Sequence, residues 1–172
     1  MSELQTGFII SRNWRDTDQG VELEFWLSTD AGPRQLLVPG QESLFFLPCS
    51  QQQRASELLK TDFLYRTESL ELRDFESRTV AGFYFRSQRQ LRQARDRLEA
   101  AGLDPLEADI NPAERYLMER FVAGSLAFQE GSGGPRLRAA DYQPQLKMLS
   151  VDIETAMQGV ELYSIGVYGK WG

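Results

Sequence analysis

Two acidic side chains separated by one residue, Asp152 and Glu154, are the residues of this chain best placed to do chemistry. They lie at the end of an apolar run, in the segment Ser150-Val151-Asp152-Ile153-Glu154-Thr155. Side chains alternate along a strand, so both carboxylates project from one face, about 6.6 Å apart along the backbone. Two divalent ions about 3.5–4 Å apart can hydrolyse a phosphodiester, one generating hydroxide and the other stabilising the leaving oxygen. The pair is therefore a candidate for catalysis and for metal binding.

The amino-acid composition restricts which chemistry these carboxylates could share. The chain contains no histidine, which excludes a Ser-His-Asp triad, a Cys-His pair and any zinc site that needs imidazole. Cys49 is the single cysteine, so no internal disulfide can form. Any metal site would use oxygen ligands alone, which favours Mg²⁺ or Mn²⁺.

Length and charge limit the class of protein. A chain of 172 residues suits one domain, or one domain and part of another, and 41% hydrophobic and 26% charged residues are typical of globular proteins. We find no signal peptide and no apolar run near the roughly 18 residues that span a membrane, and therefore expect a cytoplasmic protein with no membrane partner. The net charge of −6 argues against tight independent binding to DNA.

The hydrophobic pattern predicts an α+β fold, in which a strand-rich domain with about three helices precedes the acidic pair. Alternation over 21–27 indicates a half-buried strand, and Asn111 with Pro112 predicts the start of a helix that continues through Val122. One further helix is expected to begin at Ser50, and another is expected over 88–101. Further strands are expected over 8–14, 34–38, 43–47, 70–75 and 80–85, and a terminal hairpin over 146–153 and 161–168.

The terminal hairpin presents a physical conflict. A strand as apolar as 148–153 is expected to be internal, and two acids at its end are costly unless they are exposed, paired or bound to metal. No helix or strand follows the hairpin to cover its faces, and an isolated hairpin is only marginally stable. Either the hairpin completes the preceding domain, or it begins a second domain that this sequence does not finish.

Three stretches of the chain resemble bacterial members of the family B DNA polymerases. They are residues 7–17, residues 112–121 and residues 141–155, in the family's order and at about its spacing. The Asp152-Ile153-Glu154-Thr155 segment is similar to the family's first exonuclease motif. The resemblance covers nearly the whole chain and is more specific than the acidic pair alone.

The resemblance implies an amino-terminal fragment of a DNA-directed DNA polymerase with a proofreading 3′→5′ exonuclease, acting in replication and repair. Residues 1–145 would form the family's N-terminal domain, and residues 146–172 the first hairpin of a ribonuclease-H-like exonuclease domain. Asp152 and Glu154 would hold two divalent ions, Mg²⁺ or Mn²⁺. Primer-template DNA and dNTPs are the implied partners of the intact enzyme, with a sliding clamp as a further candidate. The family's other exonuclease aspartates have no counterpart here, so we expect the fragment to be inactive.

Two alternatives remain open from the residues. Arg86, Arg89 and Arg92 belong to an arginine-rich stretch that could contact phosphates, as in a non-catalytic module for single-stranded nucleic acid. Asp96 and Glu99 interleave with these arginines, which favours a solvated helix face instead. The chain could also be a complete small metal-dependent phosphodiesterase that adds Asp141 to the acidic pair.

Overall fold

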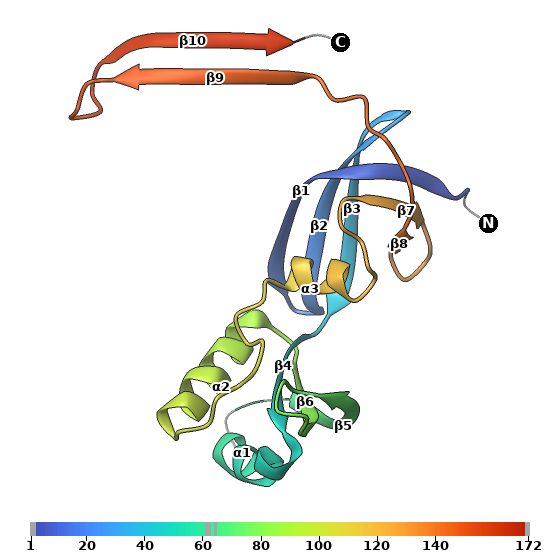
Figure 1. Cartoon of the computed structure of the whole chain (residues 1–172), viewed down its shortest axis with the longest axis vertical. Coiled ribbons are helices and arrows are strands. Elements are labelled where there is room, and N and C mark those ends of the chain that lie inside the picture. Colours follow the sequence, from blue (N-terminus) through green and yellow to red (C-terminus); the bar gives the residue numbers. More distant parts are fainter. Residues whose placement is uncertain (1–2, 61–62, 64, 171–172) are drawn as a thin grey trace.

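A computed structural model describes residues 3–60, 63 and 65–170, and its first part is an antiparallel five-stranded sheet (Figure 1). The strands follow the order β3-β2-β1-β7-β8. The predicted alternation is confirmed in β2, where Val21, Leu23, Phe25 and Leu27 are buried. The bounds are β1 Gln5–Thr17, β2 Gly20–Thr29, β3 Gly32–Gln41, β7 Ser125–Gln129 and β8 Arg136–Ala139.

Helix α3 (Pro112–Met118) packs on the buried face of this sheet. The Asn111 side chain accepts a hydrogen bond from the Ala113 backbone at 2.9 Å, as the sequence predicts for a helix cap. The helix ends at Met118, four residues earlier than expected, because the backbone reverses at Phe121, which has a φ of 54°. Tyr116 and Leu117 of α3 join Phe25 and Phe128 of the sheet in the first hydrophobic core.

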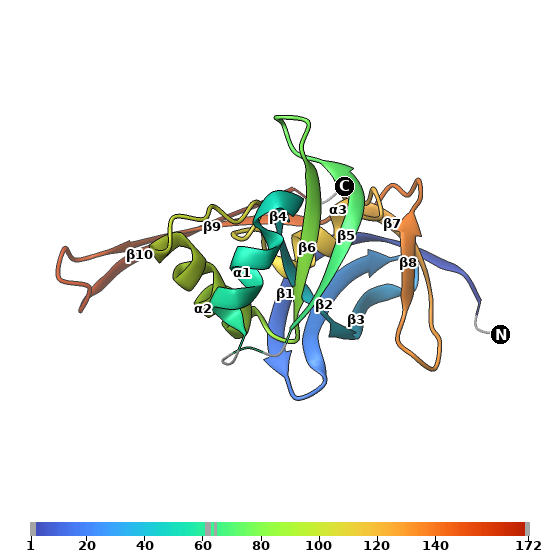
Figure 2. The same ribbon diagram turned by 90° about the horizontal axis from the view of Figure 1, so that it is seen from below.

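The second part is a three-stranded antiparallel sheet, in the order β4-β6-β5, with two helices on one side (Figure 2). Phe45, Phe83 and Phe85 are fully buried between these strands and the helices, in a second core. Leu106 adds one antiparallel bridge to Phe46 at the free edge of β4. The elements are β4 Ser43–Pro48, a 3₁₀ turn Cys49–Gln51, α1 Gln52–Leu59, β5 Tyr65–Arg73, β6 Thr79–Phe85 and α2 Gln88–Ala100.

The two cores share no residue, and polar contacts connect their surroundings. The Asp16 carboxylate at the end of β1 accepts hydrogen bonds from the Gln88 and Arg89 amides at 2.8 and 3.0 Å. Ser87 accepts from the Gln90 amide at 3.2 Å, so the first turn of α2 is capped from both parts of the molecule.

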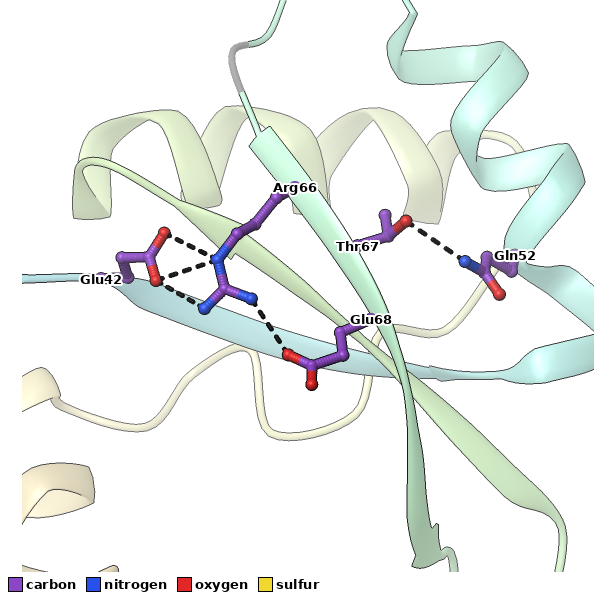
Figure 3. A network of polar contacts seen from close by, with 5 residues as sticks. All are labelled: Glu42, Gln52, Arg66, Thr67 and Glu68. Carbon is purple, nitrogen blue, oxygen red and sulfur yellow. Dashed lines mark hydrogen bonds and ion pairs between the residues drawn. The ribbon is translucent and has the colours of Figure 1, made fainter.

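A charged network links β5 to Glu42, the residue that precedes β4 (Figure 3). The Arg66 guanidinium donates to Glu42 at 2.7 Å and to Glu68 at 3.1 Å, and it stacks 3.7 Å from the centre of the Tyr84 ring. Desolvation, followed by the charge of Glu68, raises the pKa of the Tyr84 hydroxyl. Glu42 and Glu68 pair with the Arg66 guanidinium, so this arginine makes a structural contact and is not available to bind an anionic ligand.

The third part is a hairpin of β9 (Met148–Thr155) and β10 (Leu162–Lys170). In Figure 1 it lies beyond the five-stranded sheet, on the side opposite α1 and α2. It forms a two-stranded sheet of its own and pairs with neither larger sheet.

Several expectations from the sequence are wrong in detail. The first helix begins at Gln52 rather than Ser50, and no side chain caps it. Strands β7 and β8 were not expected from the sequence. Among the residues that the structure describes, no helix is long and apolar enough to cross a membrane.

Candidate metal centre

Strand β9 places Asp152 and Glu154 on one face of the hairpin, as their spacing predicts. Asp152 lies opposite Gly166 and Glu154 lies opposite Ser164 across the strand pair. A Cβ at Gly166 would meet the Asp152 Cβ at 3.8 Å, an ordinary van der Waals contact, and the glycine itself places no side chain opposite Asp152. Both carboxylates are exposed, and their hard oxygens suit a divalent ion that binds from this side.

Glu154 has one hydrogen-bond partner that the sequence did not reveal. The Ser164 hydroxyl donates to Glu154 Oε2 at 3.2 Å. A register shift between Leu162 and Ser164 brings this serine opposite Glu154, and periodicity alone does not predict such an irregularity. The hydroxyl fixes one carboxylate oxygen and leaves the other available to a metal.

The other face of the hairpin is apolar and uncovered. Leu149, Val151 and Ile153 are 56%, 51% and 58% exposed, and Ile165 and Val167 lie opposite two of them. The expectation that this strand is internal is therefore wrong for the described chain, because neither core extends to it. This apolar face therefore packs against neither core of the described chain.

The acidic pair lacks further metal ligands within the described residues. No group of three or more Asp, Glu or Cys side chains there is arranged to hold a metal ion. Asp141, the acid considered as an additional ligand, is exposed and lines a cleft with Phe8 and Phe121. The arrangement places two carboxylates on one face of one strand, and no third acidic side chain joins them among the described residues.

The arginines considered for nucleic-acid binding lie at the start of α2. Arg86, Arg89 and Arg92 are exposed, and the Arg92 guanidinium lies 5.5 Å from the centre of the Trp14 ring. Arg86 and Arg89 form no ion pair with a carboxylate of the described chain. Arg95, further along the helix, pairs with Asp96 at 2.7 Å. The structure thus brings three cations to one end of α2, remote in sequence from the acidic pair.

Tyr142 connects the five-stranded sheet to the hairpin, a role that the sequence did not suggest. Its carbonyl accepts a hydrogen bond from the Ser125 hydroxyl at 2.8 Å, and its own hydroxyl donates to Asp30 Oδ1 at 3.0 Å. Desolvation and the contact with Asp30 raise the pKa of the Tyr142 hydroxyl. The segment that leads to Asp152 is therefore fixed to the sheet at residue 142.

Comparisons with known proteins agree with the division between the two cores. Residues 7–42 match the family described as DNA polymerase II, N-terminal, and residues 43–103 match DNA polymerase II, insertion domain. The chain is 45% identical to DNA polymerase II of Escherichia coli (strain K12), over 96% of this chain and 22% of that protein. It thus spans about a fifth of the length of this relative.

The fold is also similar to a solved structure. The family B DNA polymerase of the hyperthermophilic archaeon Pyrobaculum calidifontis matches with a TM-score of 0.65 and 16% sequence identity. The match covers 97% of this chain and 27% of that chain. At this identity the likeness concerns the arrangement of helices and strands.

Proposed function

Because the chain belongs to the DNA polymerase II family of the family B DNA polymerases, we propose that it is the amino-terminal part of a DNA-directed DNA polymerase. Its two successive domain matches and its 45% identity over nearly the whole chain support this proposal. The substrates of the intact enzyme would be primer-template DNA and dNTPs, in replication and repair in the cytoplasm. A sliding clamp would be a further partner.

The hairpin is proposed as the start of a 3′→5′ proofreading exonuclease domain over 146–172, after an N-terminal region over 1–145. The observation that carries this proposal is the two-faced hairpin, with Asp152 and Glu154 on one side and an uncovered apolar surface on the other. An apolar surface of this kind is expected where more of a sheet and its covering helices pack.

In the intact enzyme, Asp152 and Glu154 would hold Mg²⁺ or Mn²⁺, and the metals would supply an activated water and stabilise the leaving oxygen. The chain's own contribution is to hold the two carboxylates on one face of β9 and to orient Glu154 through Ser164. With no third acidic ligand grouped there among the described residues, the 172-residue chain is proposed to be inactive alone.

Arg86, Arg89 and Arg92 are proposed to contact DNA phosphates only within the intact enzyme. The net charge of −6 opposes independent binding by this chain. A salt-dependent affinity of the isolated chain for single-stranded DNA, lost in Arg89→Gln, would favour the binding module instead.

The test uses the intact polymerase with Asp152→Asn and Glu154→Gln, which keep the size of each side chain and remove its charge. Excision of an unpaired 3′ nucleotide should fall by more than about 100-fold, while templated synthesis persists. Glu161→Gln, an exposed acid in the turn of the same hairpin, is the matched control and should keep full excision. Excision that survives both substitutions would contradict the assignment.

A further inference from the structure

Phe121 adopts a backbone conformation that is unfavourable for a phenylalanine. Its φ of 54° lies in the left-handed region, where a bulky side chain is an outlier. It follows α3 at the position where glycine is usual, with Phe121 and Val122 amides donating to the carbonyls of Met118 and Leu117 at 3.0 and 2.9 Å. The helix end needs the conformation, but it does not need a side chain there.

The Phe121 side chain gains little from its own chain. It is 88% exposed, so the ring is not part of either core. The exposed ring contributes little to folding, whereas the left-handed backbone costs stability that glycine would not lose. This combination indicates that the ring contacts a surface outside the 172 residues.

The ring lines an open cleft of about 670 Å³, of mixed polar and apolar lining, beside the segment that leads to the hairpin. The cleft is lined by Phe8, Phe121, Gly124, Ala139, Ala140 and Asp141, among others. A Cβ at Gly124 would lie 2.9 Å from the Phe8 ring, so a larger residue there would displace that ring. Small residues thus keep the cleft open between two aromatic rings.

Two observations identify what this cleft receives. First, the chain leaves for the hairpin from the edge of this cleft. Asp141 lines the cleft and precedes Tyr142, and the Tyr142 carbonyl accepts a hydrogen bond from Ser125, which also lines the cleft. The hairpin then presents an uncovered apolar face, and the E. coli relative continues far beyond the length matched here. We propose that Phe121 and its cleft dock an apolar surface of the exonuclease body that begins at β9–β10. This inference rests on the proposed function.

Phe121→Gly separates docking from folding, because its effect should differ between two forms of the protein. In the 172-residue chain, relief of the left-handed strain should raise the folding equilibrium constant by about fivefold. In the intact polymerase, loss of the ring should speed amide exchange over 123–125 and 139–141 by more than about fivefold.

Two variants are matched controls. Ser77→Gly relieves a φ of 63° in the turn between β5 and β6, and Phe75→Ala removes another fully exposed phenylalanine from that turn. Neither should change exchange over 123–125 or 139–141. Unchanged exchange in intact Phe121→Gly would overturn the docking proposal. That result is independent of catalysis, whereas failure of the exonuclease assignment appears as excision that survives Asp152→Asn.

Discussion

Asp16 provides the sharpest test of how the two cores are joined, because one carboxylate caps a helix that begins 72 residues later. It accepts the Gln88 and Arg89 amides at 2.8 and 3.0 Å, and the Gln88 side chain is buried beneath this contact. Replacing a helix cap by alanine costs about 1 kcal/mol, and a carboxylate near the positive end of a helix adds about 0.3–1 kcal/mol. Ser87 still caps the third amide and water reaches the exposed carboxylate, so Asp16→Ala should cost about 1 kcal/mol.

The assay is urea unfolding of Asp16→Ala, Asp16→Asn and the control Asp18→Ala, whose carboxylate makes no hydrogen bond or ion pair within the described chain. In a Trp26→Phe, Trp171→Phe background, Trp14 fluorescence reports on the junction, because the Arg92 guanidinium of α2 lies 5.5 Å from the centre of that ring. Asparagine keeps an oxygen acceptor and loses the charge, so its cost should be about half as large. Equal stability of Asp16→Ala and Asp18→Ala would refute the capping argument, as would unchanged amide exchange at Gln88 and Arg89.

Three further outcomes follow from the packing and charges. Phe83→Ala should cost about 3–5 kcal/mol in urea unfolding, confined to the second core, and unfolding of the first core should not shift. Despite desolvation, hydrogen bonds from the Arg78 amide and guanidinium hold the Asp74 carboxyl pKa below its ordinary 3.8. The turn that Asp74 closes should therefore be intact above pH 3.8 and should open as the pH falls through the lower pKa of Asp74 in the folded protein. An NMR titration of Asp74 with a midpoint at or above 3.8 would be the contrary result. Deleting residues 146–172 should leave both cores folded and reduce self-association in sedimentation velocity, and equal association would show that the exposed hairpin is not responsible.

Local features of the fold were predictable from the sequence. Alternation in β2 identified its buried face, and Asn111 with Pro112 identified the start of α3, because both signals act within a few residues. The end of α3 was not predictable, since Phe121 stands where glycine would signal a stop. Short strands such as β8, with four residues, carry too little periodicity to be distinguished from a loop.

Contacts between distant residues were beyond the sequence. Nothing near Asp16 indicates that it caps α2, and nothing near Tyr142 indicates that it reaches Asp30. For the candidate site, the period of two correctly placed Asp152 and Glu154 on one face of a strand. The partner of Glu154 depends on a register shift in β10, which appears only when both strands are paired in space.

We propose that Asp152 and Glu154 form half of a two-metal site in the intact enzyme. Electron paramagnetic resonance of Mn²⁺ tests it most directly, with the isolated chain and the intact polymerase compared under the same conditions. We expect a spin-coupled pair of ions in the intact enzyme, lost in Asp152→Asn and retained in Glu161→Gln, and no coupled pair in the isolated chain. A coupled pair that persists in the Asp152→Asn, Glu154→Gln double variant would contradict the account.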